Sequence, residues 1–267
     1  CNIYKLNSIE MKELTVVKIG GNIVDKEDAL DIFLKDFNKM KGPKILIHGG
    51  GVLASEISKK LGIVPNMING RRVTDHETLK IVSMVYAGWI NKSIVAGLQK
   101  IGCNAIGLSG ADGDSVPATK RAPEPIDFGY VGDVNPANIN SSFLESLLAR
   151  GICPVFCAIT HDRNGSLLNT NADTMASSVA IAMSRDYNVK LIYCFEKDGV
   201  LFNQEDPESI VPLITRSNYE KLKEEGVVSG GMIPKLDNAF QAIESGVSEV
   251  TIKHARNLGN GKGTIIR

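Results

Sequence analysis

Two lysines, each next to a pair of glycines, are the residues best suited to carry chemistry in this sequence. Lys18 is followed by the pair Gly20-Gly21, and Lys235 comes shortly after the pair Gly230-Gly231. Glycine lets backbone N–H groups approach a ligand closely, and the N-terminus of a helix attracts anions. A lysine at that end of a helix is unfavourable unless an anion lies between them. The two segments therefore predict a phosphate site, although each lysine alone could be an ordinary surface residue.

The segment His48-Gly49-Gly50-Gly51 follows a β-rich run and precedes a helical pattern, which places its N–H groups near Lys18. It permits three interpretations. The first is an anion-binding turn. The second is a dinucleotide fingerprint, Gly49-x-Gly51-x-x-Ala54, although no acidic residue ends the next strand. The third is the oxyanion loop of a serine esterase with Ser109 as nucleophile, but a loop follows Ser109 where that motif requires a helix.

Two further motifs carry polar side chains suited to a small charged substrate. Arg71 and Arg72 precede a helix, and a guanidinium group can hold a carboxylate with two hydrogen bonds. A solvated arginine pair is the alternative. Asn169, Asn171 and Asp173 lie where a strand becomes a helix. Asn171 is a natural helix N-cap, yet two amides and a carboxylate together could also bind a polar ligand and orient a lysine.

The composition excludes several classes of protein. The 267 residues include 30 basic and 30 acidic side chains, so the formal net charge is zero and no basic field would attract nucleic acid or an anionic membrane. No signal peptide and no apolar run of about 18 residues is recognisable. The five cysteines lack the spacing of a zinc site, and no other metal site is predicted. We therefore expect a cytoplasmic protein with reduced thiols.

The motifs need a scaffold, and the sequence alternates β-rich runs with helical patterns. Strands are predicted at 14–19, 43–47, 104–108, 152–156, 189–194, 249–252 and 263–266, helices at 28–40, 52–61, 75–100, 171–183 and 236–245, and a long loop at 109–125. Such alternation is typical of parallel strands joined by crossover helices. The predicted fold is α/β, a three-layer αβα sandwich with a mostly parallel central sheet. Residues 1–11 are interpreted as an extension or cloning remnant, and the two lobes as 12–168 and 169–267.

Taken together, the motifs resemble the amino acid kinase family, and within it the branch that acts on acylated glutamate. The resemblance runs from about Thr15 to the C-terminus. Its motifs are, in order, Lys18-Ile19-Gly20-Gly21, His48-Gly49-Gly50-Gly51, Asn69-Gly70-Arg71-Arg72-Val73-Thr74, Gly129-Tyr130-Val131-Gly132-Asp133-Val134, Asn169-Thr170-Asn171-Ala172-Asp173 and Gly230-Gly231-Met232-Ile233-Pro234-Lys235. The resemblance implies ATP-dependent phosphorylation of the γ-carboxylate of N-acetyl-L-glutamate to an acyl phosphate in arginine biosynthesis. The first lobe would bind the acylglutamate and form the dimer, and the second would bind ATP.

The resemblance also implies how the phosphoryl group is handled. Lys18 and Lys235 would neutralise its charge, Asp173 would hold both lysines by ion pairing, and Gly21 and Gly50 would give it backbone N–H bonds. Mg²⁺ would be carried by the phosphate oxygens of ATP. The nucleophile would be a carboxylate with an unperturbed pKa of about 4.3, which is ionised at neutral pH, so no general base is needed.

The remaining roles implied by the resemblance concern the two substrates. Arg72 would bind the α-carboxylate of the acylglutamate, and Asn169 its acylamino portion. The full substrate-binding set is Gly49, Gly50, Gly51, Arg72, Asn169 and Asn171, and the full nucleotide-binding set is Lys18, Gly20, Gly21, Gly199, Gly231, Met232 and Lys235.

Three segments depart from the family pattern. Phe195-Glu196 stands where Thr or Ser followed by Asp is usual, Trp89 replaces a usually smaller residue, and 157–160 replaces a segment with proline and glycine beside the substrate. The departure at Phe195 affects the nucleotide contacts, whereas the other two make a longer acyl group an alternative, as in N-succinyl-L-glutamate. Only about a dozen residues precede the first strand, too few for the helix that links arginine-inhibited members into hexamers, so we expect an arginine-insensitive homodimer. A non-catalytic sensor with this fold is a further alternative.

Overall fold

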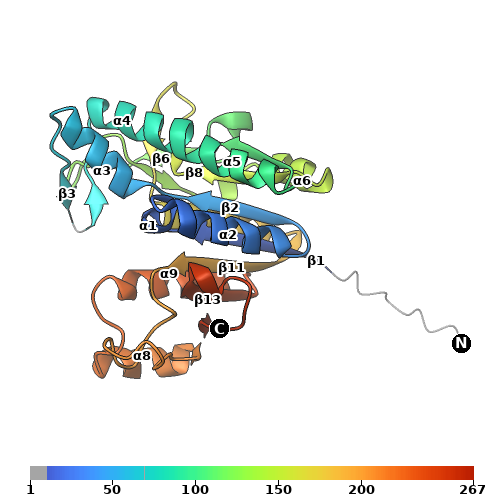
Figure 1. Cartoon of the computed structure of the whole chain (residues 1–267). Helices are drawn as coiled ribbons and strands as arrows, with labels where there is room; N and C mark the ends of the chain where they lie inside the picture. Colours follow the sequence, from blue (N-terminus) through green and yellow to red (C-terminus); the bar gives the residue numbers. More distant parts are fainter. Residues whose placement is uncertain (1–10, 69) are drawn as a thin grey trace, which may run out of the picture.

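A central sheet organises the computed structural model, which describes residues 11–68 and 70–267. The predicted N-terminal extension (apart from Met11) and Asn69 of the arginine motif lie outside the described residues. The sheet has eight strands in the order β12-β14-β13-β11-β1-β2-β8-β5 (Figure 1). Their bounds are Lys12–Ile19 (β1), Lys44–His48 (β2), Ala105–Leu108 (β5), Cys153–Cys157 (β8), Tyr187–Phe195 (β11), Leu213–Ile214 (β12), Glu249–His254 (β13) and Thr264–Ile266 (β14).

Strand pairing in this sheet is parallel except for one pair near one end. β1 lies between β2 and β11 and pairs with both in parallel, and β11 pairs in parallel with β13. Only the β13–β14 pair is antiparallel in the described sheet. Parallel strands require crossover connections, and helices supply them here. The predicted α/β fold with a mostly parallel sheet is confirmed.

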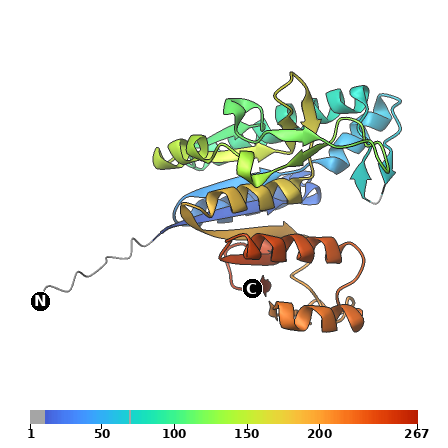
Figure 2. The same ribbon diagram turned by 180° about the vertical axis from the view of Figure 1, so that it is seen from behind.

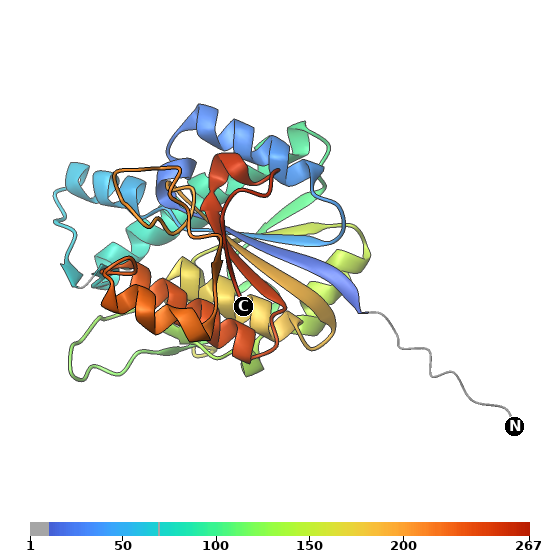
Figure 3. The same ribbon diagram turned by 90° about the horizontal axis from the view of Figure 1, so that it is seen from below.

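Helices cover both faces of the sheet, which gives the three layers (Figures 2 and 3). The helices are α1 (Gly21–Val24), α2 (Glu27–Lys39), α3 (Gly51–Lys60), α4 (His76–Ser83), α5 (Asn91–Lys100), α6 (Ser141–Ala149), α7 (Ala172–Met183), α8 (Arg216–Glu224) and α9 (Met232–Glu244). One hydrophobic core joins alternate strand residues such as Val16 and Leu191 to α7 and α9. A second core joins Val17 and Leu46, which point to the opposite face, to α2 and α5.

The predicted helix 75–100 is observed at His76–Lys100, but its middle turn, Met84–Ile90, is π-helical. By length and composition alone this helix could cross a membrane, although the sequence pattern predicted no membrane span. Core helices of soluble proteins have the same property, and 44% of its most apolar 18-residue window is buried in the fold. This single helix is therefore weak evidence for a membrane span.

Several short elements were not predicted. They include α1, α6, α8, β12 and three antiparallel hairpins: β3 (Met67–Ile68) with β4 (Arg71–Arg72), β6 (Ala118–Lys120) with β7 (Gly132–Val134), and β9 (Ile159–His161) with β10 (Leu167–Asn169). Strands of two or three residues are too short to show a periodic pattern. The segment predicted as a loop at 109–125 therefore contains strand β6, whose partner lies beyond the loop.

Candidate active site

The site lies at the carboxyl edge of β1, β2 and β11, where open parallel sheets bind ligands. Lys18, near the end of β1, is only 7% exposed, and its Nζ lies 2.7 Å from Oδ1 of Asp173 in the first turn of α7. Tyr193 is the register partner of Lys18 on β11, and its hydroxyl donates to the backbone oxygen of Asp173 at 3.2 Å. Asp173 was predicted to pair with both lysines; the ion pair with Lys18 is present, but among residues 11–68 and 70–267 no ion pair joins Asp173 to Lys235.

The two glycine turns lie side by side. A Cβ on Gly21 would be 3.6 Å from the backbone nitrogen of Gly51, so the turns after β1 and β2 touch through their backbones. Gly50 has no room for a side chain, because a Cβ there would lie 2.3 Å from Cδ1 of Ile90. Ile90 belongs to the π-helical turn, which presses against the glycine loop. The predicted juxtaposition of Lys18 with bare backbone amides is thus observed.

His48 supports this loop from inside the core. Its side chain is buried, Nδ1 lies 2.8 Å from the oxygen of Gly49, and Nε2 lies 3.1 Å from Nδ2 of Asn91. Because the Asn91 amide is a donor, Nε2 accepts and Nδ1–H donates to Gly49. Burial lowers the pKa of His48 from 6.5 to about 4, and the hydrogen bond to Gly49 opposes this shift. A buried, neutral ring with both nitrogens occupied is structural rather than catalytic.

Arg72 presents a free, buried donor. The side chain lies in β4 and is 7% exposed, and its Nη2 donates to the oxygen of Gly51 at 2.9 Å and to Oγ of Ser55 at 2.7 Å. Its Nη1 is buried and has no hydrogen-bond partner among residues 11–68 and 70–267. A buried guanidinium donor without a partner is costly, and a carboxylate would satisfy it with a charge-assisted hydrogen bond.

Asn169 and Asn171 already form hydrogen bonds within the protein, but with different partners. Nδ2 of Asn169 donates to Oγ1 of Thr74 at 3.0 Å. Oδ1 of Asn171 accepts from the backbone nitrogens of Asp173 and Thr174 at 2.9 and 3.0 Å, so Asn171 is the N-cap of α7. Both asparagines line a cavity, and an N-cap role does not prevent the remaining amide group of Asn171 from meeting a ligand.

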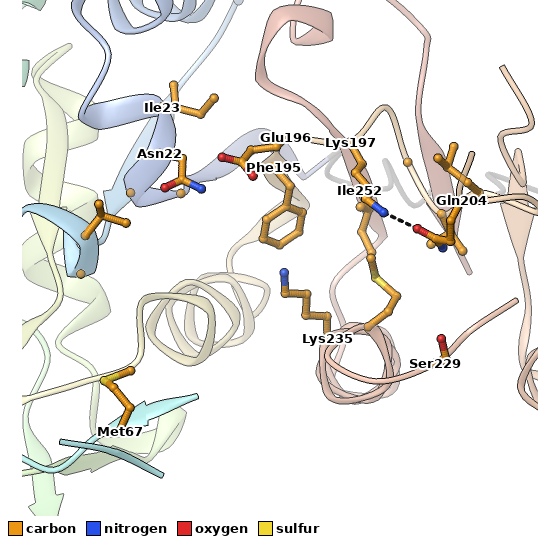
Figure 4. Close-up of a pocket in the computed structure, with 18 of the residues that line it drawn as sticks. Asn22, Ile23, Met67, Phe195, Glu196, Lys197, Gln204, Ser229, Lys235 and Ile252 are labelled. Atoms are coloured by element: carbon orange, nitrogen blue, oxygen red, sulfur yellow. Dashed lines mark hydrogen bonds between the residues drawn. The ribbon is translucent and has the colours of Figure 1, made fainter. Parts of the chain in front are cut away.

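Two cavities meet at this edge of the sheet. The smaller has a volume of about 240 Å³ and the larger about 910 Å³ (Figure 4). Gly21, Gly51, Met67 and Arg72 line both, so the glycine turns form their boundary. Of the predicted site residues, the small cavity collects Lys18, Gly21, Gly49, Gly50, Gly51, Arg72, Asn169 and Asn171, and the large cavity collects Gly20, Gly21, Gly51, Arg72, Gly199, Met232 and Lys235. Gly231 and Asp173 line neither cavity.

Lys235 enters the large cavity from the first turn of α9. Its side chain rises toward the ring of Phe195 at the end of β11 (Figure 4), and its Nζ lies 3.6 Å from the ring centroid. Burial lowers the pKa of Lys235, the charge of Asp173 raises it, and the charge of Lys18 lowers it. Lys18 on β1 and Lys235 on α9 are far apart in sequence, and the charges of Lys18 and Asp173 both act on Lys235.

The loop after β11 is held by a buried carboxylate. Asp198 has a side chain that is 3% exposed; it pairs with Arg256 at 2.9 Å and Lys262 at 3.3 Å and accepts from Nδ2 of Asn257 at 2.8 Å. Burial raises the pKa of Asp198, but hydrogen bonds and charge from Arg256 and Lys262 outweigh it and leave the pKa lowered. Gly199 follows directly, so this network places the wall of the large cavity.

Three residues of the site, Tyr86, Arg121 and Ser55, were not predicted from the sequence. Tyr86 and Arg121 line the small cavity, and Ser55, which lines the large cavity, orients Arg72. Ser55 lies one helical turn after Gly51, a spacing that could have indicated a shared face. Tyr86 lies within an ordinary helical pattern and Arg121 within a segment predicted as loop, so neither carried a signal.

The esterase interpretation finds no support in this geometry. Oγ of Ser109 donates to Oδ2 of Asp112 at 2.8 Å, whereas His161 lies 3.0 Å from Asp114. A nucleophilic serine requires a histidine within hydrogen-bond reach, and His48 is occupied elsewhere. In the described part of the chain, no three His, Cys, Asp or Glu side chains gather as a metal site.

The site thus combines two cations, bare amides and an unsatisfied arginine at the junction of a small and a large cavity. Phosphoryl transfer needs such positioning and charge stabilisation more than acid–base chemistry. The three-layer fold and this site define a phosphotransferase class, and the comparison with known families agrees. Residues 13–254 match the amino acid kinase family, and the chain belongs to that family.

Among relatives, the chain is 49% identical over 258 residues to the acetylglutamate kinase of Phocaeicola vulgatus, covering 96% of this chain and 100% of that one. It is 53% identical over 249 residues to the acetylglutamate kinase of Cytophaga hutchinsonii, covering 93% and 94%. The crystal structure of smu.665 from Streptococcus mutans is similar with a TM-score of 0.76 at 28% identity, covering 95% of this chain and 98% of that one. Giardia lamblia carbamate kinase bound to AMP-PNP shares the fold, with a TM-score of 0.69 at 15% identity, covering 96% and 98%.

Proposed function

We propose that this protein transfers the γ-phosphoryl group of ATP to the γ-carboxylate of N-acetyl-L-glutamate, giving an acyl phosphate and ADP. One observation carries the proposal: a small cavity rich in cations opens onto a large cavity where Lys18 and the two glycine turns meet. Relatives that are about half identical over nearly the whole chain are named acetylglutamate kinases, which supports the same substrate here.

The acylglutamate would occupy the small cavity. The free Nη1 of Arg72 would bind its α-carboxylate, which satisfies the buried donor. Asn169 and Asn171, which line the same cavity, offer amide groups to the acylamino portion. The γ-carboxylate would then point toward Lys18 and the turns that contain Gly21 and Gly50. This arrangement assigns the acylglutamate to the lobe 12–168 with a contribution from the start of 169–267.

ATP would occupy the large cavity, with its phosphates toward the glycine turns and Lys235. The N-terminus of α9, Met232 and the loop at Gly199 form its wall, and the volume of about 910 Å³ is ample for a nucleotide. Mg²⁺ bound to the phosphate oxygens would offset their negative charge. The lobe 169–267 therefore supplies most of the proposed nucleotide site.

The transfer itself would be an in-line displacement. An oxygen of the ionised γ-carboxylate forms a bond to the γ-phosphorus as the bond from that phosphorus to the bridging oxygen of ADP breaks. No proton has to be removed from the nucleophile. Lys18 and Lys235 stabilise the charge on the transferring group, Asp173 keeps Lys18 in place, and the N–H groups of Gly21 and Gly50 donate to its oxygens.

The test measures ADP release with Mg-ATP together with hydroxylamine trapping of the acyl phosphate. We expect hydroxamate with N-acetyl-L-glutamate and none with free glutamate or aspartate. Lys18→Met should lower turnover by about 10²–10³-fold, as expected when a preorganised charge-stabilising group is lost. Lys39→Met is the matched control, because Lys39 is exposed on the surface of α2 and, among residues 11–68 and 70–267, forms an ion pair only with Asp36. Absence of both products with every acceptor would contradict the proposal.

The acyl group has a second candidate, because Arg121 lines the small cavity in addition to Arg72. Arg121 pairs with Asp133 and stacks on Phe128, so it is held in place. A carboxylate at the end of the acyl chain, as in N-succinyl-L-glutamate, could compete for this cation. Trp89 gives no support to a longer acyl group: it is 69% exposed and lines neither cavity. Kinetics with both substrates, in the wild type and in Arg121→Gln, decide between them.

We also propose a cytoplasmic, arginine-insensitive homodimer. Met84 and Trp89 expose apolar side chains on the helix His76–Lys100, and Ile106 does so on the edge strand β5. Exposed apolar surface is typical of interaction sites, and in the proposed dimer a second copy of the chain would cover these three side chains. Light scattering should give a dimer for the wild type and a monomer for Trp89→Glu, and arginine should leave activity unchanged. A wild-type monomer or hexamer would contradict this assembly.

A further inference from the structure

One aromatic ring lies against both lysines of the proposed phosphoryl site. The Phe195 centroid is 3.6 Å from Nζ of Lys235 and 5.1 Å from Nζ of Lys18. Phe195 ends β11 two residues after Tyr193, so both rings project to the face that carries Lys18, and they stack with centroids 6.1 Å apart and an interplanar angle of 14°. Tyr193 is buried and holds the backbone of Asp173, which anchors the stack.

The ring of Phe195 is an interaction partner for the ammonium group of Lys235. Lys18 has an ion pair with Asp173, but within residues 11–68 and 70–267 Nζ of Lys235 has no hydrogen bond or ion pair. The charged groups that face it are Asp173 from α7, Lys18 from β1 and Glu196 after β11. The face of an aromatic ring carries partial negative charge and attracts a cation, most strongly where water is excluded.

We propose that Phe195 is a positioning residue of the phosphoryl-transfer site, whose ring face holds the Lys235 ammonium beside Lys18 before the nucleotide binds. The inference rests on the proposed function. It explains why a bulky aromatic side chain stands at a cavity wall close to both proposed catalytic lysines, and why a half-buried cation at the start of α9 points into the fold. Phe195 acts through the lysines and takes no part in bond making.

A direct test needs no turnover. In protein labelled with ¹³C-lysine and free of nucleotide, the ring current of Phe195 should shift the Lys235 side-chain resonance upfield, with Lys235→Arg providing the assignment. The shift should disappear in Phe195→Leu, which keeps an apolar side chain of similar size, and persist in Phe195→Tyr. An unshifted Lys235 resonance in the wild type would overturn the proposal, even if Phe195→Leu fails to fold.

Kinetics then measure the consequence. In Phe195→Leu we expect kcat/KM for ATP to fall about 5- to 30-fold, as for the loss of a partly desolvated cation–π contact. KM for the acylglutamate should stay unchanged, because Phe195 lines only the large cavity. Loss of the ring removes a contact that favours the charged lysine, so the alkaline limb of the pH profile should move to lower pH. Phe195→Tyr should restore all three quantities.

Phe202→Leu is the matched control, because Phe202 is 55% exposed and lines neither cavity. If Phe195→Leu loses activity without a shift in the pH profile, or affects both substrates equally, Phe195 is only structural and the proposal fails. Wild-type turnover is measured in the same experiment. An inactive wild type contradicts the proposed function, whereas an active wild type with an unaffected Phe195→Leu contradicts this inference alone.

Discussion

Gly50→Ala should damage the site through a single steric conflict. Gly50 is the N-cap residue of α3, with φ 162° and ψ 23°, and it lies between the glycine turn and the π-helical segment Met84–Ile90. The added Cβ would lie 2.3 Å from Cδ1 of Ile90 and 3.0 Å from Cδ1 of Tyr86. Carbon atoms in contact prefer about 3.5–4.0 Å. Ile90 or the glycine loop must therefore move by more than about 1 Å.

The size of the effect follows from where the conflict occurs. Ile90 is 2% exposed and Tyr86 is 5% exposed, so neither can swing into solvent. Overpacking of this kind costs about 1–3 kcal/mol. Displacement of the loop by about 1 Å would also misplace the N–H donors toward the phosphoryl group, and errors of that size can lower a rate by about 10²-fold. We expect Gly50→Ala to fold, with lower stability and much lower turnover.

The assay combines urea unfolding with acyl phosphate formation. Ile90→Val removes the conflicting Cδ1, so the double variant Gly50→Ala/Ile90→Val should recover about 1 kcal/mol relative to the sum of the single variants. Gly49→Ala is the control for stability, because its Cβ would lie 3.7 Å from Cβ of Ala172, an ordinary contact. The reasoning is refuted if Gly50→Ala is as stable as the wild type, or if Ile90→Val gives no recovery.

Three further predictions concern groups held by burial or charge. The pKa of His48 is lowered from 6.5 to about 4, so below pH 6.5 the unfolded chain binds a proton at His48 that the folded chain does not bind. Between pH 7 and pH 5, the free energy of unfolding measured with urea should therefore fall by about 2 kcal/mol more in the wild type than in His48→Gln. Equal losses in the two proteins would show that His48 is not the cause. Asp198→Asn should cost about 1.5–3 kcal/mol and raise KM for ATP, because Arg256 and Lys262 lose their charged partner beside the large cavity; an unchanged midpoint in urea would contradict this. The charge of Asp173 raises the pKa of Lys235, so Asp173→Asn should lower that pKa further. The alkaline limb of the pH–rate profile should then move to lower pH. An alkaline limb that does not move would show that it does not arise from Lys235.

Much of the framework follows from local sequence. The periodicity of 14–19 and 189–194 predicted buried strands, and both are central in the sheet as β1 and β11. Since the carboxyl ends of parallel strands share one edge, Lys18 and the segment His48–Gly51 could be expected together, and they are. The N-cap at Asn171 could also be predicted, because its side chain accepts hydrogen bonds from residues only two and three positions further along the chain.

The sequence by itself determined which chemical groups are available and which ends of strands and helices they occupy, because those depend on neighbours within a few residues. Only the tertiary structure decided which groups meet. Three features depend on segments far apart along the chain: the buried Arg72 donor without a partner among the described residues, the close approach of Ile90 to Gly50, and the ring of Phe195 near two lysines. Such contacts arise from packing of the whole sheet and its helices, which no local pattern encodes.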